Sequence, residues 1–537
     1  MNLGQSFCFD DVLMEPLLSD IVTRSSINLE TNIGTNGRQL ILKTPLISSP
    51  MDTVTETDMA IKMAENGGLG IIHRYMDIDT QVSQVMKVKR FLQYIITEPY
   101  KIYPETTLLE IEELRELYNV SSFCVIDINN NLLGIITRRD IEYMKQKYYD
   151  IQTIENQQRE QQEQSVDNQS QSIVLTVRNF MSINVITLDI SMTQHSLETT
   201  LSIAKELMLE RKIEKIPIVN NSVLVGLITL NNIKHYENNK GNACIDTNGS
   251  LCVGAAVGII GDYLERLDKL INVGVDLICI DVANGFNKNV FEAITQIRSK
   301  YQHIVLMVGN VCNWQGYEAL SKYDVDCVRV GVGNGSICTT RLETGIGKGQ
   351  FSAVSECFKY RVEHNTLPNK MPNIICDGGS LGKTGNKMKA LACGSSAIML
   401  GRTLASTEES PGTIIYRNGK RFKYIRGMAS TMANLSKQEK TELNTSSLTN
   451  NSNSNTNINN KKLKTKFTAE GVDGEQELSG SVVDVIEQIN GGLKSGLSYL
   501  GCRTINEVHK KSAQDKIKFN IVTSIGMNET GIRVKTY

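Results

Sequence analysis

Eight short apolar runs, mostly separated by stretches with helical patterning, constrain the fold of this 537-residue chain more than any other feature. Runs that are apolar throughout are typical of strands buried on both faces, and the amphipathic stretches between them indicate helices that cover a parallel sheet. Eight such units fit a closed (β/α)8 TIM barrel better than an open doubly wound sheet, so we predict an α/β fold of this type. The runs are PLISS (45–49), LGIIH (69–73), VGAAV (253–257), LICID (277–281), IVLMV (304–308), CVRVG (327–331), IICDG (374–378) and AIMLG (397–401).

An internal repeat lies between the second and third of these runs. The stretches LLGIITRRDI (132–141) and LVGLITLNNI (224–233) share the pattern Leu-x-Gly-x-Ile-Thr-x-x-Asp/Asn-Ile. Each follows a strand-like run and enters a helical segment, which predicts two βαββα modules packed on each other. A chance likeness between two strand-to-helix turns is the alternative. The repeat resembles the CBS module, whose tandem pairs bind adenine or guanine nucleotides in a regulatory role.

The barrel is therefore expected to be interrupted by an inserted pair of modules. We assign residues 1–92 and 239–537 to the two parts of the barrel and residues 93–238 to the tandem pair. The copies are expected at about 93–150 and 173–238.

Two stretches of low complexity stand out from these units. Residues 155–172, between the two copies, are rich in Gln, and residues 444–460 are rich in Asn, Ser and Thr. Both hold too few large apolar side chains to offset the entropy of ordering, so we predict that both are disordered.

Composition limits the class of protein. The formal net charge of −1 gives no reason to expect nucleic acid or a membrane surface as a partner, and no run of eighteen apolar residues predicts a transmembrane helix. The start of the chain lacks the pattern of a secretion signal. The twelve cysteines include no Cys-x-x-Cys pair, which favours reduced thiols in a cytoplasmic protein over disulfides or zinc.

Polar and glycine residues gather where the predicted strands end. In barrels of this type, the loops that follow the strands carry the chemistry. Asp281 ends the fourth run, Asn310 follows the fifth, Asp377 and two glycines end the seventh, and Gly401 ends the eighth. Backbone N–H groups of such glycines suit an anion, which predicts a phosphate site at the last two strands. The simpler alternative is that these glycines only permit tight turns.

The loop after the sixth strand, GVGNGSICTTRLETGIG (331–347), delivers one cysteine among five glycines. Glycines let the backbone fold closely around a ligand and aim carbonyl oxygens at a cation. We interpret Cys338 as a nucleophile, with Thr340 able to shuttle a proton and Ser336 able to contact a phosphate. A buried and inert thiol is the commoner state of a cysteine, and we expect it for the other eleven.

Taken together, these motifs resemble the family of IMP dehydrogenase and GMP reductase. The resemblance covers nearly the whole chain, with the CBS-like pair inserted after the second strand. The motifs, in order, are SSPMDTVTE (48–56), GNGSICTTR (333–341), CDGG (376–379), LASTEESPG (404–412), RGMAS (426–430) and EGVDGE (470–475).

The resemblance implies an oxidoreductase that acts on a purine nucleoside monophosphate in purine metabolism. Cys338 would attack the carbon at position 2 of the purine ring, and a nicotinamide would exchange a hydride with that carbon. Thr340 and Glu470 would manage the protons there. The implied substrate contacts are Ser336, Asp377, Gly378, Gly379, Gly401, Arg402, Met428 and Ala429. The implied cofactor contacts are Asp281, Val282, Ala283, Gly331, Val332 and Gly333, and a monovalent cation, expected to be potassium, would lie at Gly333, Gly335, Cys338 and Arg341.

Two reactions remain open within this family. A dehydrogenase oxidises IMP with NAD and then hydrolyses the adduct to XMP, for which it uses an Arg-Tyr pair on a mobile flap. Here the flap would be residues 430–469, and the interval from Ala429 to Ala469 contains neither arginine nor tyrosine. A reductase needs no hydrolysis, because it expels ammonia from GMP and forms IMP with NADPH. IDVANGF (280–286) also resembles the reductase form.

The balance favours GMP reductase, with IMP dehydrogenase as the alternative. SSPMDTVTE, STEESPG and the inserted pair resemble the dehydrogenase more closely. A third reading is an inactive nucleotide sensor that works through the CBS-like pair; the presence of Cys338 argues against it. The family also implies a homotetramer and regulatory purine nucleotides at the inserted pair.

Overall fold

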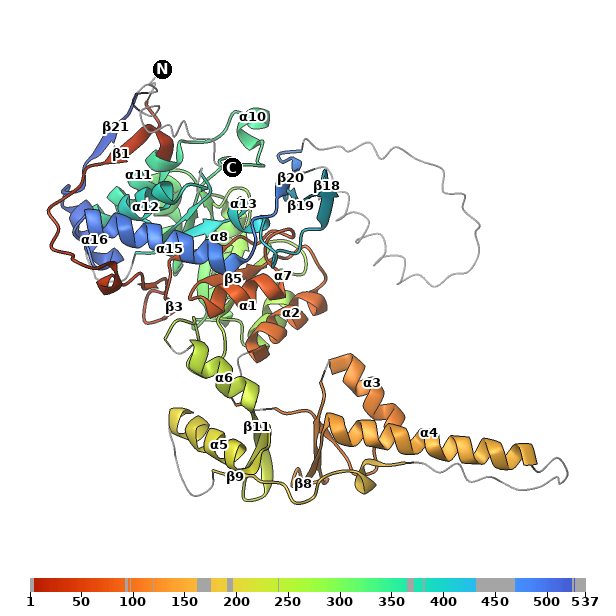
Figure 1. Cartoon of the computed structure of the whole chain (residues 1–537). Helices are drawn as coiled ribbons and strands as arrows, with labels where there is room; N and C mark the ends of the chain where they lie inside the picture. The colour runs from red at the N-terminus through yellow and green to blue at the C-terminus, as the bar shows by residue number, and fades with distance from the viewer. Residues whose placement is uncertain are drawn as a thin grey trace, which may run out of the picture. The chain divides into compact units, whose positions relative to one another are not determined.

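The computed structural model describes most of the chain, which divides into two compact units. One unit comprises Met1–Phe91 and Gly241–Tyr537, and the other comprises Leu92–Lys240 (Figure 1). The described residues are 4–91, 95–96, 98–118, 120–161, 175–190, 197–239, 241–364, 371–379, 382–430, 469–523 and 526.

The first unit is built on a closed barrel of eight parallel strands. Each of the eight predicted runs forms one strand, so the predicted barrel is confirmed. The sheet closes because β17 pairs with β4. β5 pairs with β12, although the second unit lies between these two strands in the sequence. In barrel order the strands are β4 (Leu46–Ser48), β5 (Leu69–Ile72), β12 (Val253–Val257), β13 (Leu277–Asp281), β14 (Val305–Val311), β15 (Cys327–Val330), β16 (Asn373–Asp377) and β17 (Ala397–Leu400).

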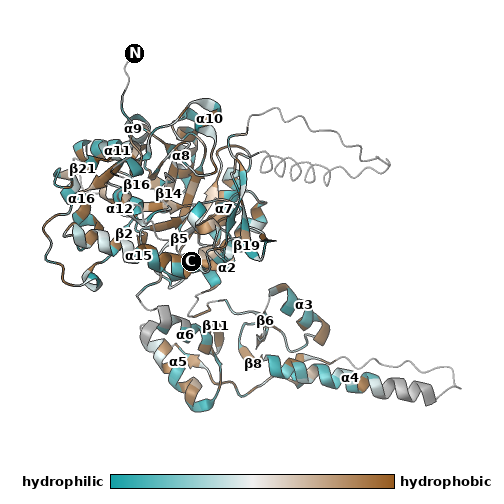
Figure 2. Ribbon diagram, turned by 45° about the horizontal axis from the view of Figure 1, so that its top comes forward, coloured by the Kyte–Doolittle hydropathy of each residue, from teal (hydrophilic) through white to brown (hydrophobic). Residues whose placement is uncertain are grey.

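Helices follow the strands and surround the barrel. The strands are mostly hydrophobic (Figure 2), and side chains such as Ile71, Met307 and Ile375 form a buried core. Helix starts are marked in the sequence: the Asn287 side chain accepts from Asn289 N–H, which caps one helix. The helices are α1 (Thr57–Glu65), α2 (Ile78–Phe91), α7 (Tyr263–Asn272), α8 (Lys288–Lys300), α9 (Trp314–Ser321), α10 (Thr340–Thr344), α11 (Gln350–His364), α12 (Thr384–Ala392) and α13 (Arg402–Ala405).

Smaller elements complete the barrel unit. Two further helices, α15 (Val482–Tyr499) and α16 (Ile505–Ala513), pack on α12, and α15 also packs on α1. The strands outside the barrel form three antiparallel sheets. They are β1 (Val12–Met14) with β21 (Phe519–Ile521), β2 (Thr31–Asn32) with β3 (Ile41–Leu42), and β18 (Ile414–Arg417) with β19 (Lys420–Arg426) and β20 (Asp473–Glu477).

The second unit contains the internal repeat. Both copies follow the predicted order of strand, helix, two strands and helix, and each has a three-stranded sheet. Cys124 and Ile126 of the first copy pack with Leu224 and Leu227 of the second. The first copy is β6 (Lys101–Ile102), α3 (Leu108–Tyr118), β7 (Phe123–Ile126), β8 (Leu132–Ile136) and α4 (Arg138–Gln161), and the second is β9 (Leu188–Asp189), α5 (Leu197–Arg211), β10 (Lys215–Asn220), β11 (Val223–Thr229) and α6 (Leu230–Asn239).

One expectation differs from the structure. We predicted disorder over 155–172, but α4 continues through the first seven of these residues, to Gln161. Gln, Glu and Arg are good helix formers, and extending an existing helix avoids the cost of nucleation. Residues 162–172 and the Asn-rich 444–460 lie outside the described residues. Within the described part of the chain, no helix is long and apolar enough to cross a membrane.

Candidate active site

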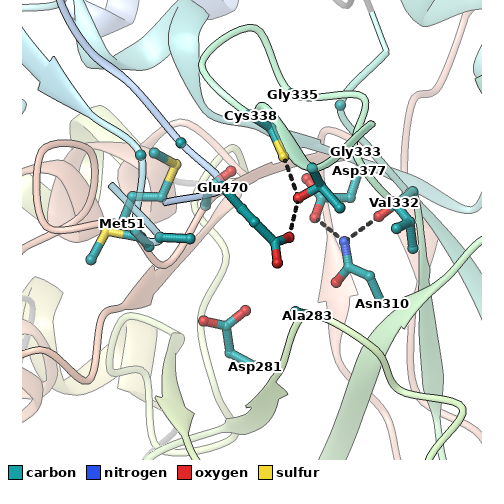
Figure 3. Close-up of a pocket in the computed structure, with 18 of the residues that line it drawn as sticks. Met51, Asp281, Ala283, Asn310, Val332, Gly333, Gly335, Cys338, Asp377 and Glu470 are labelled. Atoms are coloured by element: carbon teal, nitrogen blue, oxygen red, sulfur yellow. Dashed lines mark hydrogen bonds between the residues drawn. The ribbon is translucent and has the colours of Figure 1, made fainter. Parts of the chain in front are cut away.

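A cavity of about 400 Å³ opens at the carboxyl ends of the barrel strands. Loops from six strands and two later segments, 427–429 and 470–471, line it (Figure 3). The cavity brings together fourteen of the residues that the family resemblance implies as catalytic, substrate, cofactor or cation contacts. They are Asp281, Val282, Ala283, Gly331, Val332, Gly333, Gly335, Cys338, Thr340, Asp377, Gly378, Met428, Ala429 and Glu470.

The predicted nucleophile is joined to a carboxylate through a hydroxyl. Cys338 Sγ lies 3.2 Å from Thr340 Oγ1, and that hydroxyl donates to Glu470 Oε2 at 2.7 Å (Figure 3). The chain of contacts can carry a proton from the sulfur to the carboxylate. The Cys338 thiol is half-buried, so a ligand in the cavity can reach it.

Backbone pairing explains why residues so far apart in sequence meet here. Thr339 N–H donates to the Glu470 carbonyl at 2.9 Å, and Val472 N–H donates to the Ile337 carbonyl at 3.0 Å. Gly471 forms bridges with both Cys338 and Ser430. The segments before and after residues 431–468 therefore lie side by side next to the thiol.

The other cysteines differ from Cys338 in their surroundings. Nine of the twelve are buried, as expected for inert thiols. Burial raises the pKa of Cys279 and of Cys376 to about 12, which keeps both thiols protonated at neutral pH. Cys8 and Cys312 are half-buried, but neither lines the cavity.

A buried arginine links two of the predicted ligand contacts. Arg329 Nη1 donates to Asp281 Oδ1 at 2.7 Å, and its Nη2 donates to Asp377 Oδ2 at 2.8 Å. Asn310 Nδ2 donates to the same Asp377 oxygen at 2.8 Å. Asp377 Oδ1 is the oxygen that neither of these bonds uses. Arg329 was not predicted from the sequence, although a charged residue in the apolar run CVRVG was a signal for it.

Some predicted contacts lie outside the cavity lining. Ser336 is exposed, and Gly379 packs against Gln350. Gly401 lies beside Ser49, while Arg402 Nε donates to Gln476 Oε1 at 3.1 Å on β20. Their roles, like those of the other named contacts, stay predictions.

The four residues expected around a cation share one loop. Gly335 accepts from Cys338 N–H at 3.1 Å, and Arg341 Nε lies 3.4 Å from the Val332 carbonyl. Arg341 Cγ also packs against Gly333. Backbone carbonyls are the ligands that potassium takes in selective protein sites, so the donor type fits the expectation.

The lining also includes Arg74, Tyr75 and Asn334, to which the sequence had suggested no role. Arg74 and Tyr75 follow β5, and Arg74 Nη2 lies 3.4 Å from the Asp281 carbonyl. Burial raises the pKa of Tyr75, so its hydroxyl stays protonated and can donate. The third, Asn334, lies on the cysteine loop itself. The signal was the position of Arg74 and Tyr75 directly after a barrel strand.

Comparison with known proteins shows the family of this chain. The family model described as "IMP dehydrogenase / GMP reductase domain" matches residues 6–533. An inosine-5'-monophosphate dehydrogenase of Nitrosopumilus maritimus (strain SCM1) is 36% identical over 513 residues, which cover 95% of this chain and 96% of the relative. The enzyme of the same name from Aquifex aeolicus (strain VF5) is 35% identical over 542 residues, or 99% and 96% of the two chains.

Two matching solved structures are those of a GMP reductase. A GMP reductase variant from Trypanosoma brucei, in complex with guanosine 5'-monophosphate, matches with a TM-score of 0.79 and 30% identity. The match covers 99% of this chain and 98% of that one. The Trypanosoma brucei enzyme in complex with guanosine 5'-triphosphate matches with a TM-score of 0.69 and 26% identity, over 97% and 99% of the chains.

Proposed function

Because this chain belongs to the family of IMP dehydrogenases and GMP reductases, we propose that it is a GMP reductase, which converts GMP to IMP and ammonia with NADPH. The observation that carries the proposal is the path from Cys338 through Thr340 to Glu470, in a chain with no arginine or tyrosine between Ala429 and Ala469. The path can serve the loss of ammonia, whereas the Arg-Tyr pair that serves hydrolysis in dehydrogenases is missing from that interval.

The residues of the site have distinct tasks in this reaction. The Cys338 thiol loses its proton towards Thr340 and Glu470, and the sulfur bonds to the carbon at position 2 of the purine. Thr340 and Glu470 then return a proton to the exocyclic amine, which leaves as ammonia. NADPH supplies the hydride that this carbon receives. The carbon–sulfur bond then breaks and releases IMP, and the sulfur takes up a proton from solvent to restore the free thiol.

The nucleotide is held by groups on the last strands and the later loops. Asp377 Oδ1 accepts from the ribose hydroxyls, because Asp377 Oδ2 already accepts from Arg329 and Asn310. Gly378 and Gly379 both have positive φ angles, +77° and +86°, which turn backbone N–H groups without a side chain in the way. Ser336, Gly401 and Arg402 contact the phosphate, and Met428 and Ala429 lie along the purine.

The residues of the cavity fit a nicotinamide. Asn310 Oδ1 is buried and has no hydrogen-bond partner among the described residues, so an acceptor is available for a carboxamide N–H. Gly331, Val332 and Gly333 offer a wall with little side-chain bulk, and Asp281, Val282 and Ala283 contact the rest of the cofactor. NADPH is the proposed donor, and NAD is the cofactor of the alternative reaction.

IMP dehydrogenase is the second candidate, and a specific observation favours it. The two curated relatives named above are both inosine-5'-monophosphate dehydrogenases, at 36% and 35% identity. Under this alternative the same thiol attacks IMP, NAD accepts the hydride, and water releases XMP. We prefer the reductase because hydrolysis needs a base that the interval from Ala429 to Ala469 does not supply in the form of Arg-Tyr.

A direct assay separates the two candidates. Purified protein is mixed either with GMP and NADPH or with IMP and NAD, and the absorbance of the reduced nicotinamide is followed. We expect it to fall in the first mixture and to stay constant in the second. A rise in the second mixture with no change in the first identifies a dehydrogenase and overturns the proposal.

The remaining family properties are part of the same proposal. The repeat in Leu92–Lys240 binds regulatory purine nucleotides, potassium steadies the cysteine loop, and the chain assembles as a cytoplasmic homotetramer. Support comes from the strand–helix order of both copies and from the carbonyl donors on the loop.

A further inference from the structure

The side chain of Asn334 ties the cysteine loop to the end of β16. Its Nδ2 donates to the Asp377 backbone carbonyl at 2.8 Å and also to Gln350 Oε1. In return, Gly379 N–H donates to the Asn334 carbonyl at 3.2 Å. The Asn334 amide therefore donates both to the strand end that carries the proposed ribose contact and to Gln350 on α11.

Gln350 restricts the movement of the Asn334 side chain. Its side chain is only 1% exposed, and its Nε2 donates to the Val330 carbonyl at 2.6 Å and lies 3.3 Å from the Asp377 carbonyl. A buried amide with both ends engaged cannot turn without leaving a polar group unpaired. The Asn334 side chain is thus bonded to the end of β16 directly and to β15 through Gln350.

Close packing leaves little room for another arrangement. A Cβ atom added to Gly331 would lie 2.1 Å from the Asp377 carbonyl oxygen and 2.8 Å from Asn334 Nδ2. One added to Gly378 would lie 3.2 Å from Asn334 Oδ1. The backbones of the two loops therefore approach each other directly, with the Asn334 amide between them.

The cysteine loop is also held on both sides of the thiol, by the backbone bonds of Ile337 and Thr339 to residues 470–472 described above. Cys338 thus lies between Asn334, whose side chain is bonded to the Asp377 carbonyl, and Thr339, whose backbone N–H is bonded to the Glu470 carbonyl. We propose that Asn334 is a positioning residue, which sets the reach of the Cys338 sulfur to a purine whose ribose is held at Asp377. The inference rests on the proposed attack of Cys338 on the purine.

Loss of the tie should lower the rate of attack and leave the chemistry of the thiol unchanged. Asn334→Ala removes both donors. Asn334→Asp keeps the volume but replaces the donor with a carboxylate that faces the Asp377 carbonyl. A displacement of about 1 Å at a reacting atom costs on the order of 100-fold in rate, so we expect a loss of roughly 10- to 100-fold in both variants.

The test compares two reagents on the whole protein. The first is 2-chloroinosine 5'-monophosphate: the sulfur of Cys338 bonds to the carbon at position 2, the carbon–chlorine bond breaks and chloride leaves. The second is iodoacetamide, which alkylates the thiol without a nucleotide site. Mass spectrometry gives both rates at Cys338. Asn248→Ala, an exposed asparagine in the turn before β12, is the matched control.

We expect the nucleotide reagent to label both Asn334 variants at least tenfold more slowly than the wild type and the control, while iodoacetamide labels all four within about twofold. Equal labelling by the nucleotide reagent overturns the positioning role. So does a parallel loss with both reagents, which would make Asn334 a determinant of thiol reactivity. If iodoacetamide labels the wild type but the nucleotide reagent does not, the proposed attack is wrong and the positioning role falls with it. The melting temperature of each variant identifies a folding defect, and Asn334→Asp carries the test if Asn334→Ala does not fold.

Discussion

The Thr340 hydroxyl donates to the Glu470 carboxylate at 2.7 Å, although 130 positions separate the two residues in the chain. Thr340→Val removes the hydroxyl and keeps the shape of the side chain. General acid–base catalysis is worth about 10²- to 10⁴-fold, so we expect kcat to fall by at least about 100-fold while the Kd of GMP stays within about threefold. Thr295→Val, on the exposed face of α8, is the control. An unchanged kcat in Thr340→Val would remove this hydroxyl from the mechanism.

Glu470→Gln tests the other end of the path. Gln keeps a hydrogen-bonding side chain of the same size but cannot take up the proton. We expect a loss of kcat similar to that of Thr340→Val, and a double variant no worse than either single one, because both act on the same proton. Additive losses, measured as kcat values of the three variants, would mean that the two residues act separately.

Cys338→Ala is expected to abolish turnover while GMP or IMP still binds. The substitution removes the only atom that bonds to the substrate and leaves the ribose and phosphate contacts in place. Cys312→Ala, at a half-buried cysteine outside the cavity, should keep full activity. Calorimetric titration gives binding, and absorbance gives turnover. Residual activity in Cys338→Ala would rule out the covalent route.

Arg329 holds two carboxylates together in a buried position, with its side chain 6% exposed. Arg329→Met leaves Asp281 and Asp377 without their counter-charge, and breaking a buried pair in this way costs about 3–5 kcal/mol. We expect a marked drop in the urea midpoint of unfolding. Arg417→Met, at an exposed ion pair with Glu475, should change the free energy of unfolding by less than about 1 kcal/mol. Equal effects of the two variants would contradict the structural role of Arg329.

Lys387 predicts a pH dependence of stability. Its side chain is 1% exposed on α12, and burial lowers its pKa to about 8 from the ordinary 10.5. The folded protein therefore binds fewer protons than the unfolded chain between these values, and its stability rises as the pH increases from 8 to 10.5. Lys387→Met removes this slope. We expect the variant to be more stable than the wild type by up to about 3 kcal/mol below pH 8 and about equal to it above 10.5. A constant difference across urea titrations at several pH values would contradict the assignment.

Deletion of residues 444–460 is expected to leave the reduction of GMP largely intact, because that reaction needs no base from the interval. Initial rates with GMP and NADPH give the comparison. A tenfold or larger fall in kcat would assign the deleted stretch a part in catalysis and weaken the case for a reductase.

The barrel could be predicted because each strand contains a short, mostly apolar run, which is a local pattern in the sequence. The inventory of the site was also largely predictable, since strand ends such as Asp281 and Asp377 converge in any barrel of this kind. The pairing of Thr340 with Glu470 could only be inferred from family resemblance, because it depends on backbone bonds between distant segments. Arg329 and Asn334 were missed because their partners, Asp281, Asp377 and Gln350, lie on other elements that are distant in sequence. Local composition predicted disorder at residues 155–161, but these residues continue helix α4.

The bridges from Gly471 to Cys338 and to Ser430 bring the two ends of the segment 431–468 together at one point. In general, the entropic cost of closing a loop between two fixed ends rises slowly with its length, by only about 0.6 kcal/mol for each doubling. Insertions can therefore accumulate there over evolutionary time at almost no cost to the geometry of the nucleophile. The 17-residue Asn-rich stretch at 444–460 therefore adds little to the entropic cost of joining Ser430 to Gly471.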